Sequence, residues 1–161
     1  MNSLLTSLPA LLPLAYAYAE KHEALLLQNG IPLTADELDD ARRAGVREPE
    51  KIRRQCVLAI PEPDNGDVLF AARRSGLFQL ESSGLAVGHG IYLRQDVWNS
   101  RQILVHELVH VGQYERLGGI RPFLDIYLRE CIDPGYPFGA LEQEAILVSR
   151  DICKSPPGQK V

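Results

Sequence analysis

Two histidines stand four residues apart in the stretch ILVHELVHVGQ, residues 103–113, and a glutamate directly follows the first. On an α-helix His106 and His110 would lie about 40° apart around the axis, so that two imidazole rings can face one ion. Glu107 would be rotated by about 100° from His106, close to the same face. A glutamate in that place can take a proton from a water molecule on the ion. These positions predict a site for one zinc ion.

The composition of the stretch supports this interpretation. No other charged residue occurs between Ile103 and Gln113, and most positions are aliphatic. Charged side chains are costly in a buried helix unless something compensates them, and a bound metal does so. Gln113 falls on the ligand face, where it can hydrogen-bond a ligand. A helix whose polar residues simply face solvent is the competing interpretation.

A catalytic zinc takes three protein ligands and a water molecule. A third histidine six residues after His110 is excluded, because Arg116 occupies that position. The three cysteines are far apart and lack the spacing of zinc thiolates. The remaining candidates are the downstream glutamates, Glu115, Glu130, Glu142 and Glu144.

The motif HELVH together with the later stretch GALEQEA, residues 139–145, resembles the gluzincin branch of zinc metallopeptidases, which includes thermolysin. The closest likeness is to small single-domain bacterial members. Their third ligand commonly stands in a Glu-Ala pair near a helix start, which implies Glu144. Glu142 competes, because the two would lie about 200° apart on a helix and only one can face the site. Glu144 shares a face with Leu141 and Val148, whereas a first-turn carboxylate suits the helix dipole, so we favour Glu144.

The resemblance also implies further site residues. Tyr136 precedes Glu144 in the loop before that helix and corresponds to a tyrosine that stabilises the oxyanion, with loop packing as its alternative role. The stretch GIYLRQ, residues 90–95, is the candidate for an edge strand that pairs with an extended peptide. Tyr92 within it and His89 before it are therefore candidate substrate contacts. For His89 the alternative is a simple bend between two glycines.

The rest of the sequence predicts an α+β, zincin-like fold, with an HExxH helix and a C-terminal helix that carries the third ligand. Thr34 and Glu37 form the pattern of a capping box at one helix start. The helices are expected at 13–28, 34–45, 100–117, 121–132 and 140–153. The strands are expected at 55–61, 68–72, 76–81 and 90–95, with bends at 82–84 and 88–90, as a small antiparallel sheet of three or four strands.

The chain is predicted to form one domain, residues 1–161. Within it, N-terminal helices occupy residues 1–54, the small sheet 55–95 and the metal-site helices 99–153. Residues 154–161 are expected to be a flexible tail.

The net charge of −4 gives no indication of a nucleic-acid partner. Three separated cysteines favour a reducing compartment. The apolar stretch Leu4–Ala19 has no Lys or Arg before it, is interrupted by Pro9 and Pro13 and is short for a membrane span. The expectation is therefore a cytoplasmic protein without a stable membrane span, with export as the alternative if this stretch is a signal peptide.

Together these features predict a zinc-dependent metallopeptidase that acts on a protein or peptide substrate. His106, His110 and Glu144 would hold the zinc, and Glu107 would activate its water. The alternative is a non-catalytic module that keeps the zinc, or only the fold, for binding a partner protein. Glu107 would have no duty in a purely structural zinc site, and such sites tend to have four protein ligands.

Overall fold

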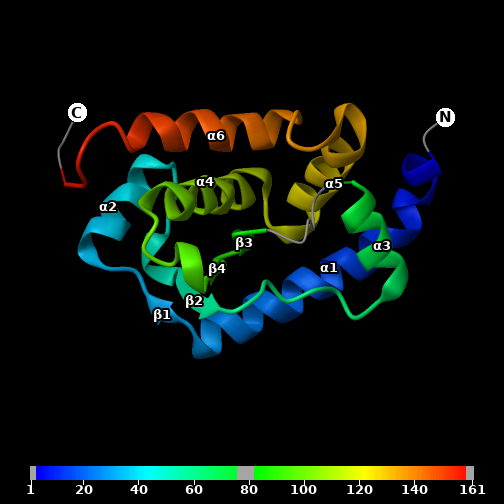
Figure 1. Ribbon diagram of the computed structural model, residues 1–161, viewed down its shortest axis with the longest axis horizontal. Helices are drawn as coiled ribbons and strands as arrows, with labels where there is room; N and C mark the ends of the chain where they lie inside the picture. Colours follow the sequence, from blue (N-terminus) through cyan, green and yellow to red (C-terminus); the bar gives the residue numbers. More distant parts are fainter. Residues whose placement is uncertain (1–2, 76–81, 159–161) are drawn as a thin grey trace.

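The computed structural model describes residues 3–75 and 82–158 and has the predicted α+β class, with six helices and a four-stranded sheet in that part of the chain (Figure 1). The helices are α1 (Ser3–Asn29), α2 (Ala35–Arg43), α3 (Gly66–Arg74), α4 (Arg101–Leu117), α5 (Ile120–Glu130) and α6 (Ala140–Ile152). The strands are β1 (Ile31–Pro32), β2 (Arg53–Val57), β3 (Gly84–Val87) and β4 (Gly90–Arg94).

The sheet is mixed, whereas an antiparallel sheet was expected. Its strand order is β1-β2-β4-β3. β1 and β3 run antiparallel to their neighbours, but β2 and β4 run parallel, with Arg53 opposite Gly90 and Val57 opposite Arg94. A parallel pair needs a crossover connection, and here the chain leaves β2 and passes through α3 before it returns through β3 to β4.

One predicted strand is a helix instead. Residues 68–72 lie in α3, which begins because the Asn65 side chain accepts hydrogen bonds from the amides of Asp67 and Val68. Asparagine is among the best helix N-caps, so a helix starts after Asn65 where a strand was expected. The strand expected at 76–81 lies outside the described residues.

The strand predicted at 90–95 is confirmed as β4, but it is not the edge of the sheet. It lies between β2 and β3, and its residues from Gly90 to Leu93 are buried. The edge strand is β3, which begins at Gly84, at the end of a predicted bend. On this side of the sheet, β3 is therefore the strand that could pair with an extended peptide.

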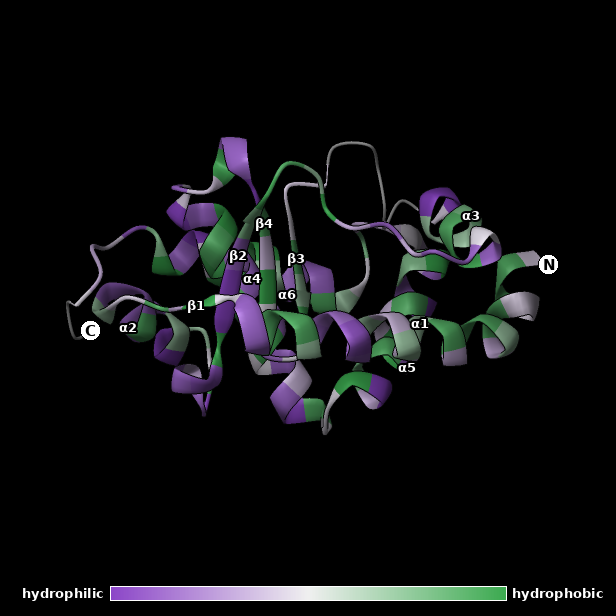
Figure 2. Cartoon of the chain, turned by 90° about the horizontal axis from the view of Figure 1, so that it is seen from below, coloured by the Kyte–Doolittle hydropathy of each residue, from purple (hydrophilic) through white to green (hydrophobic). Residues whose placement is uncertain are grey.

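Helix α1 is longer than predicted. It starts at Ser3, runs through Pro9 and Pro13, and ends at Asn29 close to the predicted end. Its C-terminal half packs against the sheet, whereas its N-terminal half extends alongside α3 and α5 (Figure 1). Hydrophilic and hydrophobic residues intermingle along the helix (Figure 2). Among the described residues, no helix combines the length and apolar character needed to cross a membrane.

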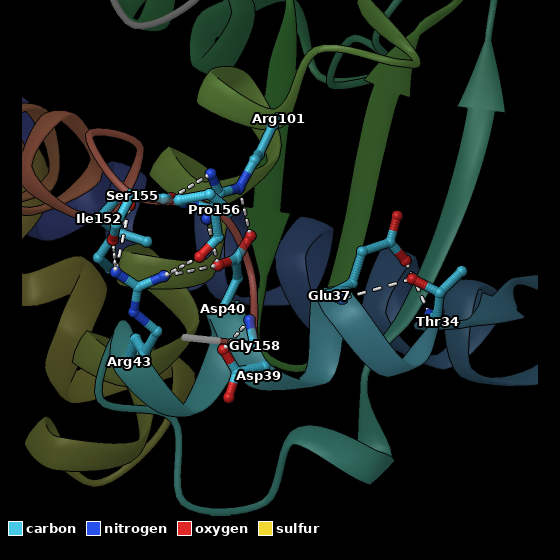
Figure 3. Close-up of polar contacts among 10 residues, drawn as sticks. All are labelled: Thr34, Glu37, Asp39, Asp40, Arg43, Arg101, Ile152, Ser155, Pro156 and Gly158. Atoms are coloured by element: carbon cyan, nitrogen blue, oxygen red, sulfur yellow. Dashed lines mark hydrogen bonds and ion pairs between the residues drawn. The ribbon is translucent and has the colours of Figure 1, made fainter. Parts of the chain in front are cut away.

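The capping box that begins α2 is confirmed, with Thr34 and Glu37 bonded reciprocally (Figure 3). The same helix and the start of α4 also contact Ser155, in the part of the expected tail that the structure describes. Arg43 donates to Ser155 Oγ at 2.6 Å, and Arg101 donates to the Ser155 carbonyl at 2.7 Å. Asp40 is buried and pairs with both arginines, so it links α2 to the start of α4 (Figure 3).

Candidate metal centre

Helix α4 carries the two histidines through the middle of the domain. It begins at an N-cap, Ser100, whose hydroxyl accepts from the Ile103 amide, and it ends at Gly118 with a left-handed φ of 101°. Most of its residues from Leu104 to Tyr114 are buried. The helix packs against β3 on one side and most extensively against α6 on another. The side chains on α4 are therefore held on a rigid element.

Three potential ligand atoms meet between α4 and α6. Nε2 of His106 lies 3.1 Å from Oε1 of Glu142, and Nε2 of His110 lies 3.2 Å from Oε2 of the same carboxylate. The two histidine Nε2 atoms lie 3.2 Å apart. His110 and Glu142 are buried, and His106 is partly buried. Burial alone would raise the pKa of Glu142, but hydrogen bonds to His106 and His110 outweigh it and lower the pKa well below its usual range.

These residues fit a zinc ion. Two imidazole nitrogens and a carboxylate are ligands that zinc accepts, at about 2.0–2.1 Å in tetrahedral sites. Ligands at that distance from a tetrahedral ion stand roughly 3.3 Å from one another, close to the 3.2 Å between the two Nε2 atoms, and one carboxylate oxygen of Glu142 completes a set of three atoms within 4.8 Å of one another. One cation placed between these three side chains would bind all of them.

The third candidate ligand is Glu142, which corrects the preference for Glu144. The Glu144 carboxylate pairs with Arg116 at 2.7 Å and accepts from Gln113 at 2.7 Å, turned away from the histidines. The reason is the rotation of α6 about its axis. Its inward stripe is Glu142, Ala145, Ser149 and Ile152, and the small residues at 145 and 149 allow α6 to approach α4. That stripe is visible in the sequence and could have identified Glu142.

Two further residues hold the ligands in place. Gln113, fully buried, accepts from Nδ1 of His110 at 2.8 Å and donates to the Leu141 carbonyl at 2.8 Å. This directs Nε2 of His110 toward His106 and Glu142, the orientation in which a metal-binding histidine uses Nε2 once that nitrogen is deprotonated. The Tyr127 hydroxyl donates to Oε2 of Glu142 at 2.8 Å. The sequence predicted that Gln113 bonds a ligand, and it bonds His110. The sequence did not indicate Tyr127, because Tyr127 stands four residues after Phe123, a spacing that also occurs in ordinary core packing.

Glu107 is buried next to the ligands. It accepts from the Ala86 amide in β3, and burial raises its pKa against the attraction of His106 and His110. A Cβ atom at Gly84 would lie 2.6 Å from Oε1 of Glu107. Glycine at the edge strand therefore provides the space that the carboxylate occupies.

Tyr136 reaches the same region from the loop before α6. Its side chain is exposed, at 37%, and it lines the same cavity as His106, His110 and Glu142. Burial and the negative charges of Glu142 and Glu107 raise its pKa well above its usual range. The hydroxyl is therefore protonated at neutral pH and can donate a hydrogen bond.

The structure does not bring His89 and Tyr92 to this site. His89 lies in the turn between β3 and β4, with Nε2 2.9 Å from Glu115 and Nδ1 3.8 Å from Glu23. Tyr92 is buried, and its hydroxyl lies 2.9 Å from Nδ1 of His22 on α1. Neither belongs to the cavity lining. Tyr92 was misplaced because β4 is an inner strand, whose side chains pack between other elements.

A cavity of about 770 Å³ opens over the triad of candidate ligands, His106, His110 and Glu142. Its wall includes His106, His110 and Glu142 together with Glu107, and it continues along residues 82–87, which contain the edge strand β3. Ligand sites commonly enclose about 300–1,000 Å³. The candidate metal centre is therefore accessible to a molecule larger than water.

The chain matches no protein family model, no characterised protein and no solved structure in the comparisons made.

Proposed function

We propose that this protein is a zinc-dependent metallopeptidase whose ligands are His106, His110 and Glu142. The observation that supports it most directly is the convergence of three ligand atoms within 4.8 Å of one another, beside the buried Glu107 and inside a cavity. A structural zinc site has four protein ligands and is closed. Three ligands at an open cavity, with an adjacent carboxylate, instead suit catalysis.

A zinc ion bound there would polarise a peptide carbonyl and lower the pKa of a water molecule toward about 7. Glu107 takes the proton of the attacking water, and its amide partner in β3 fixes the carboxylate for that role. The Tyr136 hydroxyl donates to the oxygen on which negative charge develops. β3, the edge strand at the cavity, offers backbone groups for pairing with an extended peptide.

The alternative is a zinc-containing module that binds a partner without catalysis. A closed site, with the ligands covered by packed side chains, would favour that function. The cavity over His106 and Glu142 supports access by a substrate instead.

The test combines metal analysis with the Glu107→Gln variant. We expect the purified protein to bind one equivalent of zinc and to hydrolyse a denatured protein such as casein in a zinc-dependent manner. Glu107→Gln should keep the zinc and lose activity by about a hundredfold or more, since a general base contributes 10²–10⁴-fold. Zinc binding with equal cleavage by both proteins would exclude the catalytic role of Glu107, and absence of cleavage by either would refute the peptidase.

A further inference from the structure

The cavity over the triad extends well beyond it, and its two ends differ in polarity. The end formed by the N-terminal half of α1, by α3 and by α5 is apolar. Its wall includes Leu8, Leu11 and Ala15 of α1, Val68 and Ala72 of α3, and Leu124 of α5.

The other end is polar. It is formed by the first turn of α4 and the last turns of α6, where the polar residues Gln102, Ser149 and Arg150 line the cavity beside Ile103 and Ile146. The Gln102 amide donates to the Ser149 hydroxyl at 2.8 Å, so the two helices are joined there.

The triad lies between these ends. Along α4, Gln102 stands one turn before His106, whereas Tyr114, which also lines the cavity, stands one turn after His110. Figure 1 shows the same order, with α3, α5 and the start of α1 at the opposite end of the molecule from the C-terminal end of α6. A chain lying over the triad would therefore extend into an apolar environment on one side and a polar one on the other.

The volume of about 770 Å³ falls in the upper part of the range for sites that enclose a whole small ligand. It can accept several side chains rather than one. Transfer of each such apolar side chain from water into the cavity is favourable, by about 1.5–3 kcal/mol when burial is complete, which is about a tenfold or larger gain in affinity.

Building on the proposed function, we infer that the substrate is a polypeptide segment with a run of large apolar residues on one side of the cleaved bond and polar residues on the other. A peptide fits better than a fatty acyl chain, because the cavity also follows residues 82–87, which contain the edge strand β3, and ends in a polar region. Leu11 and Ala71, which line the apolar end, would contact the apolar run.

The first experiment measures binding to the full-length Glu107→Gln protein loaded with zinc, so that no peptide is consumed. The probes are fluorescein-labelled octapeptides, one with Leu-Phe-Leu-Leu joined to Ser-Gln-Ser-Gln and one in which Ser and Gln replace the apolar run. Fluorescence anisotropy should give at least tenfold tighter binding of the apolar-polar peptide. Wild-type protein should cut that peptide at the junction, as mass spectrometry of the products would show.

The second experiment changes the wall. Leu11→Asn should weaken binding of the apolar-polar peptide by about tenfold and leave the zinc content unchanged. Its matched control is Leu14→Asn on the same helix, because Leu14 is exposed and outside the cavity lining. Ala71→Asn on α3 makes the same test from another element, in case Leu11→Asn disturbs folding.

The outcomes separate this inference from the proposed function. Zinc-dependent cleavage of both peptides with equal binding would overturn the substrate preference and leave the peptidase intact. No cleavage of any peptide or protein by the zinc-loaded wild type would overturn the peptidase. Tighter binding of a fluorescent fatty acid, weakened by Leu11→Asn and displacing the peptide, would show that the cavity holds a lipid and refute the inference.

Discussion

The carboxylate of Glu142 lies 3.1 Å from Nε2 of His106, across the interface between α6 and α4. The same carboxylate reaches His110 at 3.2 Å and accepts a hydrogen bond from Tyr127. Glu144, two residues later, is turned toward Arg116. The candidate metal centre thus depends on which face of α6 meets α4.

The two glutamates of α6 are a matched pair for testing the third ligand. Glu142→Gln should lower zinc affinity by about a hundredfold or more, because one of the three protein ligands is lost and two remain. Glu144→Gln should change the affinity by less than about tenfold, since it removes only contacts with Gln113 and Arg116. Competition with a chromophoric chelator measures both, and the reverse ranking would reinstate Glu144.

Gln113 is expected to orient His110. Gln113→Met keeps the size of the side chain but removes the hydrogen bonds to His110 and to the Leu141 carbonyl. Loss of such a partner typically costs 10–100-fold in metal affinity, and loss of these buried hydrogen bonds should lower the free energy of unfolding by about 1–3 kcal/mol. Gln102→Leu on the same helix is the control, because Gln102 is exposed and bonds only to Ser149 among the contacts described. Zinc affinity unchanged in Gln113→Met would argue against the role.

Gly84 is expected to keep Glu107 in place. In Gly84→Ala the new methyl group would lie 2.6 Å from Oε1 of Glu107, so the carboxylate must move. A displacement of about 1 Å can lower turnover by about a hundredfold, while zinc content should be retained. Gly66→Ala is the control, since nothing lies within 4 Å of a Cβ there. Equal kcat values for the two variants would contradict this dependence.

His89 should make stability depend on pH. The carboxylates of Glu23 and Glu115 raise its pKa above the ordinary 6.5, and His89 in turn lowers the pKa of Glu23 below 4.5. A raised histidine pKa contributes stability that is complete below 6.5 and is lost as pH rises through the folded-state pKa. The lowered pKa of Glu23 contributes stability that is present above 4.5 and is lost as pH falls through the folded-state pKa.

His89→Asn should therefore lower the free energy of unfolding most between pH 4.5 and 6.5, the window that these pKa shifts define. We expect a loss of about 1–2 kcal/mol at about pH 5.5, decreasing toward alkaline pH, from urea denaturation of the variant and the wild type. A loss that stays the same at acidic and alkaline pH would mean that the charge on His89 is not its source.

Local patterns in the sequence are sufficient to predict several features of this protein. The spacing of His106, Glu107 and His110 identifies the metal motif, because residues four apart on a helix necessarily share a face. The capping box of Thr34 and Glu37 and the start of α4 after Ser100 are likewise short-range, since each depends on hydrogen bonds within one turn. The capping box and the start of α4 are confirmed in the structure, which also brings His106 and His110 together with Glu142 as a possible metal site.

Only the tertiary structure decided which residues join that motif. Glu142 rather than Glu144 faces the histidines because small residues let one particular face of α6 approach α4. Tyr127 arrives from α5, and β3 rather than β4 borders the site because a crossover places β4 inside the sheet. Sequence spacing specifies which side chains share a face of one element, whereas the relative rotation and order of separate elements are set by packing over the whole chain.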